Sequence, residues 1–431
     1  MKPKKETFDT IQSSRILIVG IQTPLNTNKT VESYFEEFRN LVKSNGILYS
    51  QEMYIKLRSI DPTYFLTKGK LEELTTFCEE NDIEEIILSE PVTNKQHRNL
   101  SKILHAKIYD RTELILEIFE KGAQSAEGKL QVEIAMLEHK KTRVVGGGIE
   151  LAQQAGLLGG RGPGETQKEK ELRHFETLIS TLNKHLKQLE KVRDTQRKQR
   201  LSQCIPQVAL IGYTNAGKST ILNILTNSTV LAEDKLFATL DTTTRELFLN
   251  GKKKGLISDT VGFIQQLPTK LINAFKSTLS ELAYADLLLH VIDASDPNWR
   301  RHVAVVHEIL RELDVYKPML YVFNKIDRLS AADVTLLEMT AEKYLPHVLV
   351  SSLTKDGIEP LKKWLIEWDP KSLQYITPEP DYDDAIGADA EKRLDIHAPD
   401  VEELSSEDIA DDRLNNDEKI SEDENDDFEE F

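Results

Sequence analysis

The chain has 431 residues, 39% of them hydrophobic and 29% charged, a composition that indicates a globular protein of two or three domains and excludes a fibrous one. It has no apolar run of the roughly 18–20 residues that cross a bilayer and no signal peptide at its start, so we expect a cytoplasmic protein with no membrane partner. The net charge of −17 is concentrated in residues 371–431, which carry 23 acidic and 5 basic side chains and leave residues 1–370 at +1. We expect this acidic tail to be disordered, because it cannot bury enough apolar surface to offset the entropy of ordering it.

Residues 1–110 are predicted to form a small α/β subdomain. Four short apolar segments have the character of strands, and the segments between them show the apolar spacing of helices. The strand segments are 15–21, 47–55, 84–90 and 107–110. Alternation of strands and helices favours a mostly parallel sheet. We identify no catalytic constellation in this subdomain.

Residues 111–205 are predicted to form a helical hairpin with a glycine-rich tip. Residues 111–141 are helical, with interruptions expected near Gly122 and Gly128, and residues 144–167 form the glycine-rich loop. The second long helix carries one apolar stripe, which suits packing against the first helix. The stripe consists of Phe175, Leu178, Leu182, Leu186, Leu189 and Val192.

A basic stripe lies opposite this apolar stripe on the same helix. Its members are Lys184, Lys187, Lys191, Arg193, Arg197, Lys198 and Arg200. Such a stripe suits the phosphate backbone of RNA. On the residues alone, an ordinary solvated helix face explains it equally well.

Residues 206–370 have the pattern of a doubly wound α/β domain, with a phosphate-binding loop between its first strand and its first helix. This loop fits the pattern GxxxxGK[ST] and consists of Gly212, Tyr213, Thr214, Asn215, Ala216, Gly217, Lys218 and Ser219, with Thr220 next. The glycines let backbone N–H groups surround the phosphates at the helix N-terminus. Lys218 would reach the β- and γ-phosphates of a nucleotide, and Ser219 would bind Mg²⁺.

A second phosphate-sensing loop follows at the usual distance, directly after an apolar strand. It consists of Asp259, Thr260, Val261 and Gly262. Asp259 would hold Mg²⁺ through a water molecule, and the Gly262 N–H would meet the γ-phosphate.

One threonine between the two loops should complete the Mg²⁺ shell, and we favour Thr239 over Thr242, Thr243 and Thr244. The nucleotide-contacting segment around it is Phe237, Ala238, Thr239, Leu240 and Asp241.

A base-recognition loop ends another apolar strand and consists of Asn324, Lys325, Ile326 and Asp327. The Asp327 carboxylate can accept two hydrogen bonds from the N1–H and 2-amino groups of guanine. Adenine offers no such pair of donors, so Asp327 would select GTP over ATP. The aliphatic stem of Lys325 can cover one face of the base. Backbone contacts to the guanine oxygen would come from Ser351, Ser352 and Leu353.

The residue after Gly262 is Phe263, where many GTPases have a glutamine that orients the attacking water. A phenyl ring cannot position water, so we expect slow hydrolysis by the chain alone and a further group that completes the site. A potassium ion held by the amide oxygen of Asn215 is one candidate. The alternative is that Asn215 only caps the turn.

With these motifs assembled, the chain resembles the HflX family of ribosome-associated GTPases over roughly residues 15–368. The resemblance rests on the four GTPase motifs, on the segments FATLDTTTR and DTVGF, and on GRGPGETQ at 160–167. It implies a GTP hydrolase that uses Mg²⁺, binds the large ribosomal subunit and its RNA, and is stimulated there. Family members split stalled or idle ribosomes, and residues 144–167 would be the part that probes the ribosome.

We therefore expect an α/β protein in which a P-loop GTPase domain follows a small α/β subdomain and a long helical hairpin, with a disordered acidic C-terminal tail. We expect a monomer with no DNA partner. One alternative is a GTP-gated RNA-binding adaptor with negligible turnover. Another is an activity of the N-terminal α/β subdomain, for which the sequence offers no motif.

Overall fold

The computed structural model describes residues 15–24, 31–145, 167–202, 205–226, 237, 243–260, 262–264, 280–354 and 356–370. Most of the glycine-rich loop, the acidic tail, Val261 and the segment 238–241 with Thr239 lie outside these residues. By its internal contacts the chain forms two units, residues 1–378 and 379–431, and the described residues all belong to the first. None of the helices described is long and apolar enough to span a bilayer.

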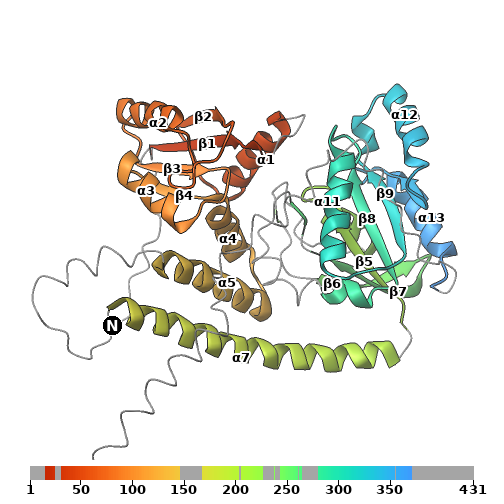
Figure 1. Cartoon of the computed structure of the whole chain (residues 1–431). Helices are drawn as coiled ribbons and strands as arrows, with labels where there is room; N and C mark the ends of the chain where they lie inside the picture. Colours follow the sequence, from red (N-terminus) through yellow and green to blue (C-terminus); the bar gives the residue numbers. More distant parts are fainter. Residues whose placement is uncertain are drawn as a thin grey trace, which may run out of the picture. The chain divides into compact units, whose positions relative to one another are not determined.

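The N-terminal subdomain is a parallel four-stranded sheet with the order β2-β1-β3-β4 (Figure 1). Its strands are β1 (Ile16–Gln22), β2 (Gln51–Lys56), β3 (Glu85–Leu88) and β4 (Lys107–Tyr109), and its helices are α1 (Val31–Ser44), α2 (Lys68–Glu80) and α3 (Asn94–Leu104). The four predicted strands are confirmed, although β2 begins four residues later than its apolar segment.

Helices pack against both faces of this sheet, as is usual for parallel sheets. On β1, Ile16 and Ile18 belong to the core with α1 and the following helix α4 (Arg111–Gly122), whereas Leu17 and Val19 belong to the core with α2 and α3. The alternation of apolar side chains along the strand therefore supplies two hydrophobic layers.

The helical hairpin begins with α4 and continues with α5 (Ala126–Val145). The predicted interruption near Gly122 is confirmed, but the one near Gly128 is wrong. Gly128 lies in the first turn of α5, where its N–H donates to the Ser125 hydroxyl at 2.9 Å. Ser125 thus acts as the N-terminal cap, and a capped first turn tolerates a glycine that would weaken a helix interior.

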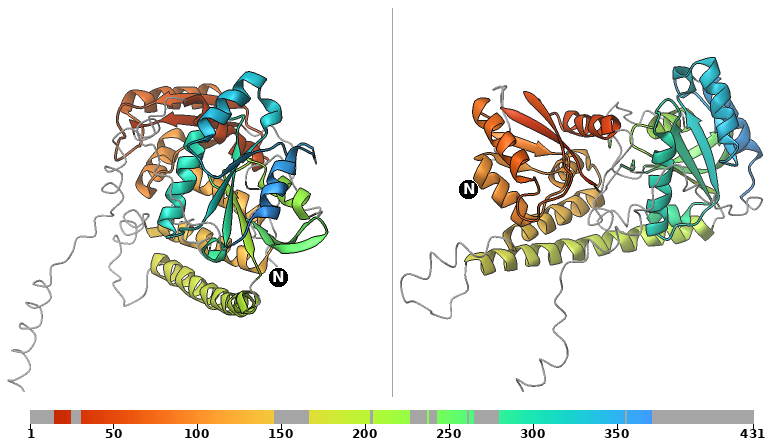
Figure 2. Two further views of the ribbon diagram at one scale, coloured as in Figure 1. Left: turned by 90° about the vertical axis from the view of Figure 1, so that its right-hand side faces the viewer. Right: turned by 45° about the horizontal axis from the view of Figure 1, so that its top comes forward.

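The long helix α7 (Gln167–Ser202) packs against α5 in antiparallel orientation, and Figures 1 and 2 show the two side by side. Ion pairs join opposite ends of the pair: Lys141 lies 2.8 Å from Glu176, and Arg193 lies 3.1 Å from Glu127. Arg193 is therefore used within the hairpin and is not part of a free basic face. The side chains of Lys184, Lys187 and Lys191 are exposed.

The apolar stripe of α7 is rotated from the predicted one. Leu178 and Val192 are 37% and 57% exposed, so their assignment to the stripe is wrong. The half-buried apolar residues are Leu172, Phe175, Ile179, Leu182, Leu186 and Leu189. Both sets have helical spacing, and the face that packs is decided by the position of α5.

The C-terminal α/β domain, residues 206–370, is built on a six-stranded sheet with the order β10-β9-β8-β5-β7-β6, in which only the edge strand β6 is antiparallel to its neighbour. The strands are β5 (Gln207–Gly212), β6 (Thr243–Leu249), β7 (Lys252–Asp259), β8 (Leu287–Asp293), β9 (Met319–Asn324) and β10 (His347–Leu349). Helices α8 (Lys218–Thr226) and α13 (Glu359–Glu367) cover one face, α11 (Trp299–Glu312) covers the other, and α12 (Ala331–Ala341) follows β9. This is the predicted doubly wound fold, and the carboxyl ends of its parallel strands share one edge.

Two histidines, His290 and His307, lie close together between β8 and α11, with ring centroids 5.7 Å apart. His290 on β8 is 1% exposed, and its Nδ1 has no hydrogen-bond partner among the described residues. Burial lowers its pKa well below the ordinary value, and His307 and Lys218 lower it further. His307 on α11 lies 3.0 Å from the Tyr321 hydroxyl through Nε2, and burial, with Arg311 adding to it, lowers its pKa to about 4.

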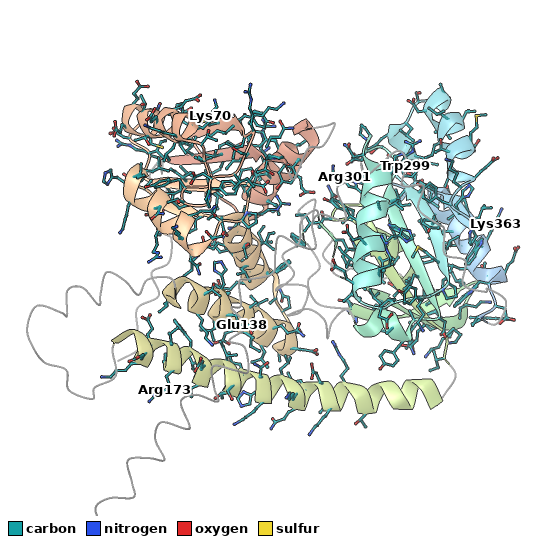
Figure 3. The ribbon with its side chains drawn as sticks, in the orientation of Figure 1. Lys70, Glu138, Arg173, Trp299, Arg301 and Lys363 are labelled. Atoms are coloured by element: carbon teal, nitrogen blue, oxygen red, sulfur yellow. The ribbon has the colours of Figure 1, made fainter. Side chains whose placement is uncertain are left out.

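This C-terminal α/β domain should lose stability as the pH falls below the ordinary pKa of histidine. The unfolded chain takes up protons near pH 6.5, whereas the folded chain takes them up at lower pH, so acid favours unfolding. For His307 the loss is about 2 kcal/mol between pH 7.5 and pH 5. All three tryptophans, Trp299 at the start of α11 (Figure 3), Trp364 and Trp368, belong to this domain, so urea unfolding followed by tryptophan fluorescence reports on it.

The matched variant is His307→Gln, which keeps a partner for Tyr321 but cannot titrate. Its free energy of unfolding should fall about 2 kcal/mol less than that of the wild type over the same pH range. Parallel pH dependences for the two proteins would show that His307 does not titrate in this way.

Candidate functional site

The phosphate-binding loop connects β5 to α8, and two of its glycines are required by contacts. Gly212 has φ +145°, and a Cβ there would lie 2.2 Å from the backbone oxygen of Val291. Gly217 has φ +99°, and a Cβ there would lie 2.3 Å from the Asn324 side-chain nitrogen. The loop can therefore approach β8 and the base-recognition loop only because these positions carry no side chain.

Lys218, the first residue of α8, points its ammonium group back over the loop. Its Nζ donates to the backbone oxygens of Gly212 at 3.1 Å and Tyr213 at 2.8 Å. The residue is 6% exposed, and burial lowers its pKa to about 8, with Asp259 opposing the shift. The hydrogen bonds of this buried cation go to neutral carbonyls, so its ammonium group can still donate charge-assisted hydrogen bonds to an anion such as a nucleotide phosphate.

The two predicted magnesium ligands that the structure describes are brought together. Ser219 Oγ donates to Asp259 Oδ2 at 2.6 Å, and Asp259 is the last residue of β7 and fully buried. A hydroxyl and a carboxylate are hard oxygen donors that suit Mg²⁺.

The residues after Asp259 serve two purposes. The Thr260 hydroxyl donates to the backbone oxygen of Leu210 at 2.7 Å, so it ties β7 to β5. A Cβ on Gly262 would lie 2.8 Å from Thr214 Cγ2 and 3.1 Å from Lys218 Nζ. Gly262 therefore lies against the phosphate-binding loop and next to its lysine.

The backbone of Phe263 is hydrogen-bonded to the phosphate-binding loop. Its oxygen accepts from Thr214 N–H at 2.8 Å, and its N–H donates to Gly212 O at 3.1 Å. The ring is 1% exposed and packs in the hydrophobic core with Ile264 and Leu282. The side chain that replaces glutamine is thus a core residue.

The base-recognition loop is held to the phosphate-binding loop by Asn324. Its Nδ2 donates to Ala216 O at 2.8 Å, its Oδ1 accepts from Ser352 N–H at 3.0 Å, and the residue is fully buried. Asp327 Oδ1 accepts from the Ser351 hydroxyl at 2.5 Å. Three loops from different strands therefore meet through one amide.

Lys325 adds a second link to the phosphate-binding loop, since its Nζ donates to Asn215 O at 2.7 Å. It also lies 2.7 Å from Asp293 Oδ2. Asp293 was not among the predicted site residues. The sequence signal that could have identified it is an acidic residue at the end of an apolar strand, which Asp293 shares with Asp259. Asn215 itself is exposed and has φ +60°.

Most of the predicted site residues lie at this one edge of the sheet, on the loops after β5, β7, β9 and β10. Those described outside the contacts above are Thr220 in α8, Ile326 next to Lys325, Leu353, which is 77% exposed, and Phe237, which is buried. The predictions for Ala238, Thr239, Leu240, Asp241 and Val261 fall outside the described residues.

A doubly wound sheet whose strand ends carry the GxxxxGKS, DxxG and NKxD loops in this arrangement defines a P-loop GTPase. Comparison with known families agrees. Residues 207–325 match the model of the "50S ribosome-binding GTPase", residues 32–120 match "GTP-binding GTPase N-terminal", and residues 122–200 match "GTP-binding GTPase Middle Region".

Similar curated proteins extend over most of the chain. A GTPase HflX of Caldanaerobacter subterraneus subsp. tengcongensis is 42% identical over 80% of this chain and 78% of its own. The GTPase HflX of Flavobacterium psychrophilum is 36% identical over 90% of this chain and 99% of its own. The GTPase HflX of Escherichia coli is 39% identical over 77% of this chain and 78% of its own. Among solved structures, the "crystal structure of SsGBP and GDP complex" is 23% identical, covers 82% of this chain and 98% of that one, and has a TM-score of 0.46.

The chain belongs to the HflX family of GTPases, and it is a GTP hydrolase. The predicted resemblance and enzyme class are confirmed, and the alternative of an adaptor without turnover is not favoured.

Proposed function

We propose that this GTPase binds the large ribosomal subunit and its RNA in the cytoplasm, hydrolyses GTP faster there, and acts as a monomeric factor that splits or rescues ribosomes. The observation that carries the proposal is the burial of Phe263, which leaves the position after Gly262 without a side chain that can orient water and so calls for an activator. The description of the matching GTPase family as ribosome-binding supports the large subunit as that activator.

In the proposed mechanism, water attacks the γ-phosphate of GTP in line with the leaving β-phosphate oxygen. The Lys218 ammonium would leave its two backbone acceptors for the β- and γ-phosphates, and Gly262 N–H would donate to the γ-phosphate. These groups stabilise the charge that develops in the transition state.

Mg²⁺ fits the donor set of this site, because Ser219 and Asp259 already place two hard oxygens 2.6 Å apart. Ser219 and Thr239 would bind the ion directly and Asp259 through water. The ion would neutralise phosphate charge, and Ser219 would exchange its hydrogen bond to Asp259 for that contact.

Recognition of guanine would rest on Asp327, whose carboxylate faces the loop of Ser351 to Leu353 through the 2.5 Å bond to the Ser351 hydroxyl. The Lys325 stem would cover the base. Asn324 would act through the other loops, since both ends of its amide are engaged by Ala216 and Ser352.

Potassium is the proposed additional cofactor, with the exposed Asn215 side chain as its ligand. Exchange of sodium for potassium should raise GTP turnover in the wild type and leave the Asn215→Gly variant unchanged. Glycine is the suitable replacement because Asn215 has a left-handed backbone that alanine would strain. Equal turnover of the wild type in both salts would exclude this role.

Binding to the ribosome is tested by co-sedimentation of the full chain with purified large and small subunits, in GDP or in a non-hydrolysable GTP analogue. We expect analogue-dependent sedimentation with large subunits. Reversal of the charge of two exposed lysines of α7, in the double variant Lys184→Glu with Lys187→Glu, should weaken this sedimentation, because these lysines would contact RNA phosphates.

The matched control is Lys95→Glu with Lys102→Glu, which reverses two exposed lysines of α3. It should sediment like the wild type. No sedimentation with large subunits in either nucleotide would contradict the proposed partner, and equal losses for the two double variants would remove α7 from the proposed contact.

A further inference from the structure

Asp293 is the last residue of β8, and both oxygens of its carboxylate are engaged. Oδ1 accepts from the N–H of Ser295 at 3.0 Å and from its hydroxyl at 2.6 Å. Oδ2 lies 2.7 Å from Lys325 Nζ. The turn after β8 therefore fixes the orientation of the carboxylate and directs one oxygen to the lysine of the base-recognition loop.

The ion pair is shielded from solvent, with side chains that are 20% exposed for Asp293 and 13% for Lys325. A shielded ammonium group needs a compensating charge, because carbonyl oxygens alone do not offset the loss of its hydration. The only carboxylate within ion-pair distance of Lys325 among the described residues is that of Asp293.

Sheet register places Asp293 where this contact is possible. Strands β8 and β9 run parallel with Asp293 opposite Asn324, and Ala294 N–H donates to Asn324 O at 2.9 Å. Lys325 follows Asn324 and has φ +64°, a left-handed conformation that is unfavourable for a residue with a side chain. A conformation of this kind persists only when neighbouring groups hold it.

Lys325 therefore joins two loops through one ammonium group, with Asp293 on one side and the carbonyl of Asn215 on the other, each at 2.7 Å. Asn215 also has a left-handed backbone, with φ +60°. The aliphatic stem of Lys325 is thereby stretched between the base-recognition loop and the phosphate-binding loop.

We propose that Asp293 is a positioning residue for guanine-nucleotide binding, which acts by holding Lys325 as one wall of the base site and as a tie to the phosphate-binding loop. The proposal rests on the proposed contact of Lys325 with the base. Without the carboxylate, the ammonium group would turn toward solvent, the stem would leave the base, and the Asn215 carbonyl would lose its donor.

The test is the Asp293→Asn variant of the full chain, with a fluorescent GDP analogue as the probe. Asparagine preserves the shape of the side chain and an acceptor for Ser295 but removes the charge. The dissociation rate of the analogue and the KM for GTP should each rise about tenfold, the effect of losing about 1.4 kcal/mol of binding. Turnover at saturating GTP should stay within threefold of the wild type, because the reacting phosphate is not touched.

The same substitution in a Lys325→Ala background separates positioning from a general effect on the fold. If Asp293 acts through Lys325, it should have no further effect there. The matched control is Asp296→Asn, in the same turn, whose carboxylate accepts from Asn298 N–H at 2.8 Å and should leave nucleotide binding unchanged.

Three results would overturn the proposal: an unchanged dissociation rate in Asp293→Asn, an equal increase in both backgrounds, or an equal increase in Asp296→Asn. Failure of the proposed base site itself is distinguishable. In that case Lys325→Ala alone would leave the dissociation rate unchanged.

Discussion

Substitution of Asp327 by asparagine is expected to change the base preference of this GTPase from guanine to xanthine. The carboxylate can accept from both N1–H and the 2-amino group of guanine, whereas an asparagine amide presents a donor to one of them. A site built to pair with polar groups rejects a mismatched base strongly, and we expect kcat/KM for GTP to fall on the order of 10³-fold. Xanthosine triphosphate carries an oxygen in place of the amino group and should be accepted by the amide.

The measurement is kcat/KM for GTP and for xanthosine triphosphate with both proteins. Asp333→Asn is the matched control: Asp333 is an exposed carboxylate in α12 that accepts from Ser330 and lies outside the base-recognition loop. Its preference should stay with GTP. Equal loss of both nucleotides in Asp327→Asn would mean that Asp327 supports the loop without contacting the base.

Replacement of Lys218 by alanine should abolish GTP hydrolysis, with a fall in kcat of at least about 10³-fold. The ammonium group is the one positive charge that the described part of the phosphate-binding loop directs at its own carbonyls. Without it, the charge that develops on the β–γ bridging oxygen would lose the cation that the phosphate-binding loop supplies. Single-turnover hydrolysis of radiolabelled GTP measures the loss independently of product release.

Lys363→Ala is the matched control for that experiment, since Lys363 is an exposed lysine of α13 (Figure 3). It should hydrolyse GTP at the wild-type rate. Tryptophan fluorescence should show that both variants are folded. A Lys218→Ala protein that is folded and retains more than a tenth of the wild-type rate would contradict the proposed role.

The elements that could be predicted are those whose signal is local. The strands of the N-terminal sheet are short apolar runs between turn residues, and the phosphate-binding loop follows from glycines at Gly212 and Gly217 that no other residue could replace there. The face of α7 could not be predicted, because two sets of residues share the helical period and only the contact with α5 decides between them.

The candidate site shows the same division. The sequence motifs identified Ser219 and Asp259. Their side chains meet, with Ser219 Oγ 2.6 Å from Asp259 Oδ2, because β5 and β7 are neighbouring parallel strands. The motif did not indicate that both ends of the Asn324 amide would be hydrogen-bonded to two other loops, because an asparagine at this position could also contact the base directly. Asp293 belongs to no motif, and only the register of β8 against β9 brings it to Lys325.

The proposal that the ribosome completes the site is tested most directly by GTP turnover of the full-length chain, alone and with purified large ribosomal subunits. The buried Phe263 predicts slow turnover alone and stimulation of tenfold or more, which is about 1.4 kcal/mol or more of transition-state stabilisation. Equal turnover with and without large subunits, in a protein that binds GTP, would contradict the proposed activation by the ribosome.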